Sequence, residues 1–169
     1  LTAKAETKNA QFYYERGLKK SDKGIYKGAI SEYTKAIEIN PEYEDAYYER
    51  GFAKENIKDY EGAISDYTKV IKLNQDAWDA YYGRGYSQWQ LEKNKAALSD
   101  FEKAIAINPE DGNIYNDRSY LREELGDYKG AASDSNRALK IFSKDKVQLS
   151  IKNIIAPAML NKRNSPMFK

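Results

Sequence analysis

The sequence predicts an all-α solenoid built from four stacked helical hairpins. The main observation is a repeat of 34 residues, which four alanines keep without exception: Ala29, Ala63, Ala97 and Ala131. A fixed period of this length is typical of stacked helix pairs, each of which buries its apolar face only against its neighbours. Asn-Pro pairs at 40–41 and 108–109 end two of the repeats. Proline disfavours helix in the residue before it and suits the first position of the next helix.

Each repeat contains two stretches with helical periodicity. In the second repeat we predict a first helix over 45–57 and a second over 60–73. The second stretch places Ala63, Ile64, Tyr67 and Val70 at the spacing of a helix that faces a core. The small residues Gly17 and Ala29 are expected to face each other where the two helices of the first hairpin cross. The predicted boundaries of the repeats are 10–43, 44–77, 78–111 and 112–143, with residues 1–9 extending the first helix.

A further amphipathic helix is predicted over 144–157, with Ser143 or Asp145 as its N-cap and Pro157 near its end. This ninth helix should cap the open end of the stack, because the fourth repeat is more polar than the others. Residues 158–169 are expected to form a flexible tail. Residues 140–169 hold seven Lys or Arg and one Asp, so the tail is basic and the repeats are acidic.

The register of the repeats resembles that of the tetratricopeptide repeat family. The matching residues of the first repeat are Tyr13, Gly17, Tyr26, Ala29, Tyr33, Ala36 and Pro41. Those of the third repeat are Tyr81, Gly85, Ala97, Phe101, Ala104 and Pro109. The resemblance covers about residues 10–143 and implies a tetratricopeptide-repeat superhelix. It also implies that the first helices of the repeats line a concave groove in which a peptide or protein segment binds.

Composition argues against several classes of function. The chain has 28 Lys and Arg against 26 Asp and Glu, which gives a net charge of only +2. That balance argues against a nucleic-acid binder, which is usually markedly basic. Histidine and cysteine are absent, so the commonest general base and the commonest metal ligands are missing. We therefore expect no enzyme activity, catalytic residue, metal site or cofactor.

The hydropathy of the chain and its first residue are the two features that concern its cellular compartment. No stretch approaches the length of about 20 apolar residues that a membrane-spanning helix needs. The sequence does not determine a compartment. We take the cytoplasm as the default, although a targeting segment could have preceded Leu1.

A pairing of charges follows the repeat. Four arginines keep the 34-residue step, and an acid follows each of them 16 residues later: Arg16 and Glu32, Arg50 and Asp66, Arg84 and Asp100, Arg118 and Asp134. The acids lie on second helices, near either their own arginine or that of the next repeat. We interpret the pairs as a half-buried ladder of ion pairs. The alternative is a set of unrelated surface charges, each of little energetic value.

The predicted groove is aromatic with acidic margins. The reference position is the glycine that recurs as Gly17, Gly51 and Gly85, with Ser119 in the fourth repeat. Two columns on the first helices should face the groove, one three residues before this position and one immediately after it. Their members, with one further ring, are Tyr14, Leu18, Tyr48, Phe52, Tyr82, Tyr86, Trp89 and Tyr120. The acids expected around them are Asp45, Glu49, Glu55, Asp79 and Glu123. The first column could equally be structural, because a tyrosine at that position is common in the family.

These residues define the partner that we expect. In co-chaperone domains of the family, a clamp of Lys, Asn and Arg holds the terminal carboxylate of a chaperone. When the clamp positions are counted from the first repeat, three of them hold Glu49, Asp79 and Gly83 instead of Lys, Asn or Arg. The two acids would repel a terminal carboxylate, so that ligand is not expected. We predict a scaffold or adaptor for an apolar or aromatic segment that is neutral to basic. The basic tail itself resembles such a ligand. The alternative is a scaffold that mainly associates with copies of itself, and a weak homo-oligomer fits either case.

Overall fold

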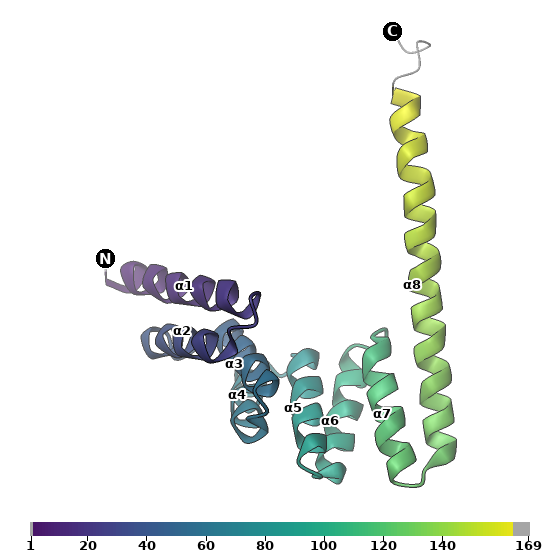
Figure 1. The fold of residues 1–169 in the computed structure, drawn as a ribbon, viewed down its shortest axis with the longest axis horizontal. Coiled ribbons are helices and arrows are strands. Elements are labelled where there is room, and N and C mark those ends of the chain that lie inside the picture. Colours follow the sequence, from purple (N-terminus) through teal and green to yellow (C-terminus); the bar gives the residue numbers. More distant parts are fainter. Residues whose placement is uncertain (1, 164–169) are drawn as a thin grey trace. The chain divides into compact units, whose positions relative to one another are not determined.

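The computed structural model describes the backbone of residues 2–163 and the side chains of residues 9–144 and 146. Within that range the chain forms eight α-helices and no strand (Figure 1). Their bounds are α1 Thr2–Ser21, α2 Tyr26–Ile39, α3 Glu44–Asn56, α4 Tyr60–Leu73, α5 Trp78–Gln90, α6 Asn94–Ile107, α7 Gly112–Glu124 and α8 Tyr128–Arg163. Successive pairs are the predicted hairpins. The chain divides into two units, Leu1–Pro109 with α1–α6 and Glu110–Lys169 with α7 and α8.

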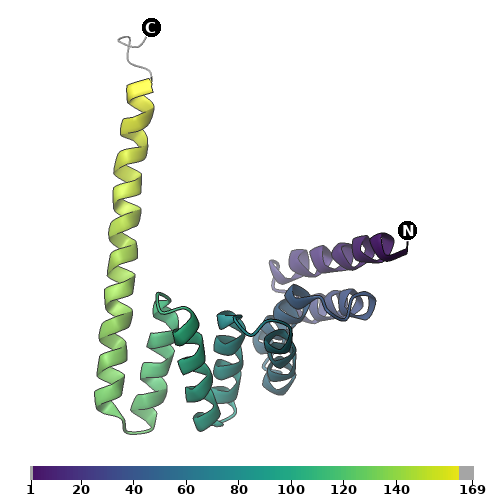
Figure 2. The same ribbon diagram turned by 180° about the vertical axis from the view of Figure 1, so that it is seen from behind.

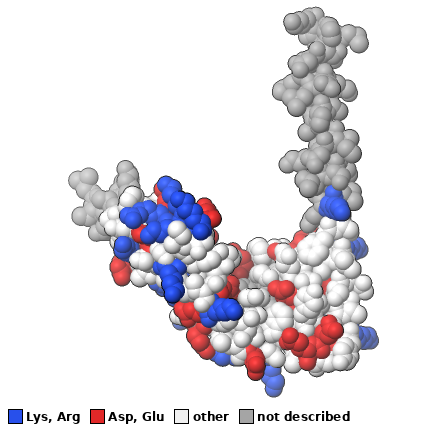
Figure 3. Space-filling model, in the orientation of Figure 1, with Lys and Arg blue, Asp and Glu red and all other residues white. Residues whose placement is uncertain are grey.

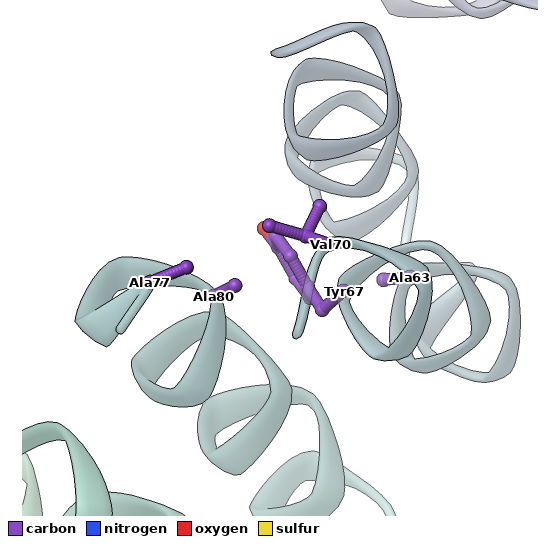
Figure 4. Packing of buried hydrophobic residues seen from close by; sticks show 5 residues of the cluster. All are labelled: Ala63, Tyr67, Val70, Ala77 and Ala80. Atoms are coloured by element: carbon purple, nitrogen blue, oxygen red, sulfur yellow. The ribbon is translucent and has the colours of Figure 1, made fainter. Parts of the chain in front are cut away.

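The first unit contains three hairpins that pack in chain order. α1 packs on α2, α3 on α4 and α5 on α6, while α2 contacts α3 and α4 contacts α5. The core of this unit follows the 34-residue repeat. Equivalent positions of the three hairpins hold the buried rings of Tyr33, Tyr67 and Phe101, which are at most 1% exposed. In Figure 4 the side chains of Tyr67 and Val70 on α4 point toward Ala77 and Ala80 at the start of α5.

Glycine makes room for these buried rings. A Cβ atom at Gly17 would lie 2.3 Å from the ring of Tyr33, and one at Gly85 would lie 3.0 Å from the ring of Phe101. The nearest neighbour of Gly17 is therefore an aromatic ring and not Ala29. The small residue allows the ring to pack between the two helices of the hairpin.

The second unit is a hairpin whose second helix is far longer than its first. α7 and α8 bury Ile114, Leu121, Ala138 and Ile141. Figures 1 and 2 show α8 running back along α7 and continuing well past the beginning of α7.

The prediction of a separate ninth helix is wrong, because α8 continues without a break from Tyr128 to Arg163. Between Gly130 and Pro157 the sequence has no glycine or proline to end it. The hydroxyl of Ser143 does not cap a new helix but donates to the backbone carbonyl of Lys140, at 3.0 Å. The helix also continues through Pro157 and includes residues 158–163, which we had assigned to the tail. Residues 164–169, the end of the tail that resembles a ligand of the groove, lie outside the described residues.

The ladder of ion pairs is confirmed, and each acid pairs with the arginine of its own hairpin. The pairs of Arg50, Arg84 and Arg118 are bidentate, with N–O distances of 2.7–2.9 Å. Arg16 reaches Glu32 at 3.3 Å. All four carboxylates are buried. A second cation joins three of them: Lys20 on Glu32, Lys54 on Asp66 and Arg122 on Asp134.

The ladder also ties neighbouring hairpins together. Arg50 donates a further hydrogen bond to Thr34 of the preceding hairpin at 3.0 Å, and Arg84 donates one to Thr68 at 3.2 Å. The guanidinium groups of Arg50 and Arg84 also lie over the rings of Tyr47 and Tyr81. The ladder is therefore a structural feature of the hairpins.

Candidate functional site

The predicted aromatic residues of the first unit lie on the first helix of each hairpin. α1 carries Tyr14 and Leu18, α3 carries Tyr48 and Phe52, and α5 carries Tyr82, Tyr86 and Trp89. Phe52 is 42% exposed, whereas the others are partly buried. Tyr120 and Glu123 lie on α7 of the second unit, and both are exposed there.

The column of tyrosines before the glycines has a structural role. The rings of Tyr14, Tyr48 and Tyr82 each pack against the buried ring of their own hairpin, with centroids 5.6–6.0 Å apart. Leu18 likewise packs against the core cluster of Ala29 and Tyr33. These contacts hold the tyrosines in place, while parts of Tyr14, Tyr48 and Tyr82 still line the cavities described next.

A cavity of about 230 Å³ lies between the second and third hairpins. Five aromatic rings, two acids and one glycine line it: Tyr48, Phe52, Tyr67, Tyr82, Tyr86, Glu55, Asp79 and Gly83. The structure thus brings six of the predicted site residues together around one space. Trp89 is not part of this lining but contacts Tyr86 edge to face, with centroids 6.3 Å apart.

A smaller cavity of about 80 Å³ adjoins the first one. The two share Tyr48 and Asp79, and the smaller is further lined by Tyr14, Glu44, Asp45, Glu49 and Val70. Burial, and then the charges of Asp45 and Asp22, raise the pKa of the Glu49 carboxyl above its usual value. We call the two cavities together the groove. Its smaller end is acidic and its larger end is aromatic.

Gly83 allows the ring of Tyr67 to reach the groove. A Cβ atom at this position would lie 2.6 Å from Cζ and 2.9 Å from the hydroxyl oxygen of Tyr67. The other repeats carry an acid here: Glu15, Glu49 and Asp117. We did not predict Gly83 or Tyr67 as site residues. The glycine was detectable in the sequence as a break in the 34-residue register.

The carboxylate of Glu55 is held by two hydroxyl groups from neighbouring helices. Ser87 on α5 donates to Oε1 at 2.6 Å, and Tyr67 on α4 donates to Oε2 at 3.1 Å. Burial raises the pKa of Glu55 to about 7, although the two hydrogen bonds act in the opposite direction. Burial also raises the pKa of Tyr67, so its hydroxyl keeps the proton that it donates. Ser87 was a third residue that the prediction missed.

The acids of the groove differ from those of the ladder in having no internal cation. Buried Asp66 and Asp100 are matched by arginines, as described above. No lysine or arginine contributes to the pKa of Glu49 or Glu55, which burial raises in both cases. Among the described side chains, no cation therefore offsets the cost of burying these two carboxylates.

The described residues contain no group of acids that could hold a metal ion. None of the helices in that range combines the length and apolar character needed to cross a membrane. In Figure 3 both acidic and basic side chains are visible on each unit.

The fold and the repeated packing define a helical-repeat protein. Family models for the TPR repeat match residues 21–58 and 57–92, and the tetratricopeptide repeat model matches residues 78–111. Together these matches span more than half of the chain, which belongs to the tetratricopeptide repeat family. Proteins of this class present extended surfaces to partners and serve in general as scaffolds for protein–protein interaction, not as enzymes.

Solved structures of the same class are similar along most of the chain. A crystal structure of MamA is 26% identical, with a TM-score of 0.78, and the match covers 86% of this chain and 85% of that one. The first TPR domain of Spaghetti (RPAP3), solved with the HSP90 peptide SRMEEVD, is 27% identical with a TM-score of 0.69. That match covers 71% of this chain and 95% of the RPAP3 domain.

Two further matches support only the fold or a short segment of the chain. The Arabidopsis OM64 TPR domain, at 24% identity and a TM-score of 0.69, covers 70% of this chain and 98% of its own and shares the fold. An uncharacterised protein of Methanocaldococcus jannaschii is 44% identical over 39 residues, which is 23% of this chain. The chain matches 45% of the length of that relative.

Proposed function

We propose that this chain is a scaffold that binds a peptide or protein segment in the groove of its first unit. The observation that carries the proposal is the cavity between the second and third hairpins. It combines five aromatic rings with two acids, Glu55 and Asp79, that form no ion pair with a cation among the described side chains. Tyrosine and phenylalanine offer large contact area with few rotatable bonds, so they suit recognition.

The charge of the groove selects the kind of segment. Acids at both cavities would repel an anionic partner and attract a neutral or basic one. The peptide in the RPAP3 structure, SRMEEVD, carries acids and would meet like charge here. The ligand that fits is therefore apolar or aromatic, and neutral to basic.

A selection of random peptides displayed on phage tests the proposal. We expect the intact chain to enrich peptides with aromatic and basic residues. A variant with both Phe52→Ala and Tyr86→Ala should bind the enriched peptides about tenfold or more weakly, which corresponds to about 1.4 kcal/mol, because aromatic side chains are enriched among the residues that dominate binding. Tyr128→Ala is the matched control, because this ring is 70% exposed and lies on the second unit. Equal binding by all three proteins would contradict the proposal.

Self-association remains the second candidate. It is favoured by exposed apolar side chains on α8, where Leu139 is 65% and Phe142 is 42% exposed. Light scattering separates the candidates. A monomer at high concentration contradicts self-association. An oligomer that Leu139→Glu dissociates, while Lys140→Glu leaves it intact, supports it.

A further inference from the structure

We propose that the larger cavity is a subsite for one cationic side chain, lysine or arginine, of the bound segment, with Glu55 as its ion-pair partner. This inference rests on the proposed function and makes it more specific. The cation would enter between the rings and end at the carboxylate that Ser87 and Tyr67 hold.

The size and the walls of the cavity fit a long side chain with a charged end. A water molecule takes about 30 Å³ in the liquid, so a cavity of about 230 Å³ has room for the stem of a lysine or arginine. Aromatic faces attract cations within about 6 Å of the ring centre. The rings would therefore pack on the aliphatic stem and also stabilise its charge.

The charges around the cavity decide between a cation and a neutral group. Glu55 and Asp79 both line the space. Neither takes part in the ion pairs of the described residues, in which Arg50, Arg84 and Arg118 pair instead with the buried acids of the ladder. An ion that is partly withdrawn from water is costly unless a partner compensates it. The raised pKa of Glu55 reports the same cost. A cationic ligand supplies the missing partner.

The site occurs at one junction of the repeat. The positions equivalent to Glu55 are Ser21, Trp89 and Glu123, and those equivalent to Ser87 include Ala53 and Leu121. The hydroxyl–carboxylate bridge between adjacent hairpins therefore departs from the repeated packing. The ion pairs of the ladder, in contrast, recur in every hairpin. A purely structural bridge is the competing explanation, and it makes no prediction of cation binding.

The test compares two small probes by NMR on the whole chain. n-Butylammonium mimics a lysine side chain, and n-butanol is its neutral counterpart, both titrated at constant ionic strength. At about pH 8 most of Glu55 is ionised, since its pKa is about 7. We expect butylammonium to shift the signals of Gly83, Ser87 and the cavity rings, with an affinity about tenfold above that of butanol. Equal affinities, or no binding of butylammonium, overturn the proposal without any variant.

Two variants locate the effect. Glu55→Gln should lower the affinity for butylammonium about tenfold and leave that for butanol unchanged. Glu123→Gln occupies the equivalent position on the second unit, where the acid is exposed, and should bind both probes as the unaltered chain does. Equal loss in both variants would mean a general effect of charge and would overturn the proposal.

The two proposals can fail separately. Phage selection that enriches peptides without lysine or arginine contradicts the cationic subsite while the groove remains a peptide site. Binding of butylammonium with no enriched peptide supports the subsite and contradicts the proposed function.

Discussion

Arg84 and Asp100 form a bidentate ion pair, with Nε to Oδ2 and Nη2 to Oδ1 both at 2.8 Å. Asp100 is 5% exposed, so its charge depends on this partner. Asp100→Ala should lower the free energy of unfolding by about 3–5 kcal/mol, because it leaves a partly buried guanidinium without its carboxylate. Denaturant unfolding measures the change.

The control for this variant is Asp76→Ala, in the exposed turn before α5, which should change stability by no more than about 0.5 kcal/mol. Asp111 is a poorer control, because its side chain caps α7 by accepting from the backbone of Asn113. Equal losses of unfolding free energy in Asp100→Ala and Asp76→Ala would mean that the ladder contributes no more than ordinary surface charges do.

Gln88 lies where the other hairpins carry the second cation of the ladder. Its equivalents Lys20, Lys54 and Arg122 each reach the buried acid of their hairpin, whereas Oε1 of Gln88 is buried without a hydrogen-bond partner. Gln88→Lys should therefore stabilise the protein by about 0.5–1 kcal/mol, which is the range of a partly exposed pair. Thermal unfolding of Gln88→Lys is compared with that of Gln90→Lys, which adds the same charge at an exposed position. No gain over that control would show that the third hairpin cannot accommodate the cation.

Gly83 is predicted to be intolerant of any side chain. The Cβ atom of Gly83→Ala would have to displace the ring of Tyr67, which is 1% exposed. We expect a loss of about 1–3 kcal/mol, as for other overpacked cores, and weaker binding of the enriched peptides. Gly28→Ala is the control, because its Cβ atom would meet only side-chain atoms of Ile25 and Lys20. Alanine also favours helix over glycine. Equal stability of the two variants would mean that the ring of Tyr67 can move without cost.

Glu55 should make stability depend on pH near neutrality. Its pKa is about 7 in the folded chain and near 4.5 when unfolded, so the folded state binds the proton more tightly. The resulting stabilisation is complete below about pH 4.5 and is lost as pH rises through about 7, by roughly 3 kcal/mol at the most. The difference in unfolding free energy between the unaltered chain and Glu55→Gln isolates this group from other acids such as Glu49. A difference that stays constant between about pH 5 and about pH 8.5 would contradict the assignment.

The sequence by itself determined the parts of the protein that recur. The 34-residue step predicted the hairpins, and the spacing of 16 between arginine and acid predicted the ladder. A contact that is made in every repeat leaves the same residues at the same spacing, so the pattern is readable without coordinates. The aromatic column and the acids near it followed from the same register.

Only the tertiary structure decided the features that occur once. The bridge from Ser87 to Glu55 joins residues 32 apart on different hairpins, and the ring of Tyr67 meets Gly83 only because α4 packs on α5. Such contacts depend on how helices are placed side by side, which a periodic pattern does not specify. The 34-residue repeat also did not specify the length of α8. Ser143 would begin a new helix as its N-cap only if the backbone left the helix there, and in this chain α8 continues through that residue.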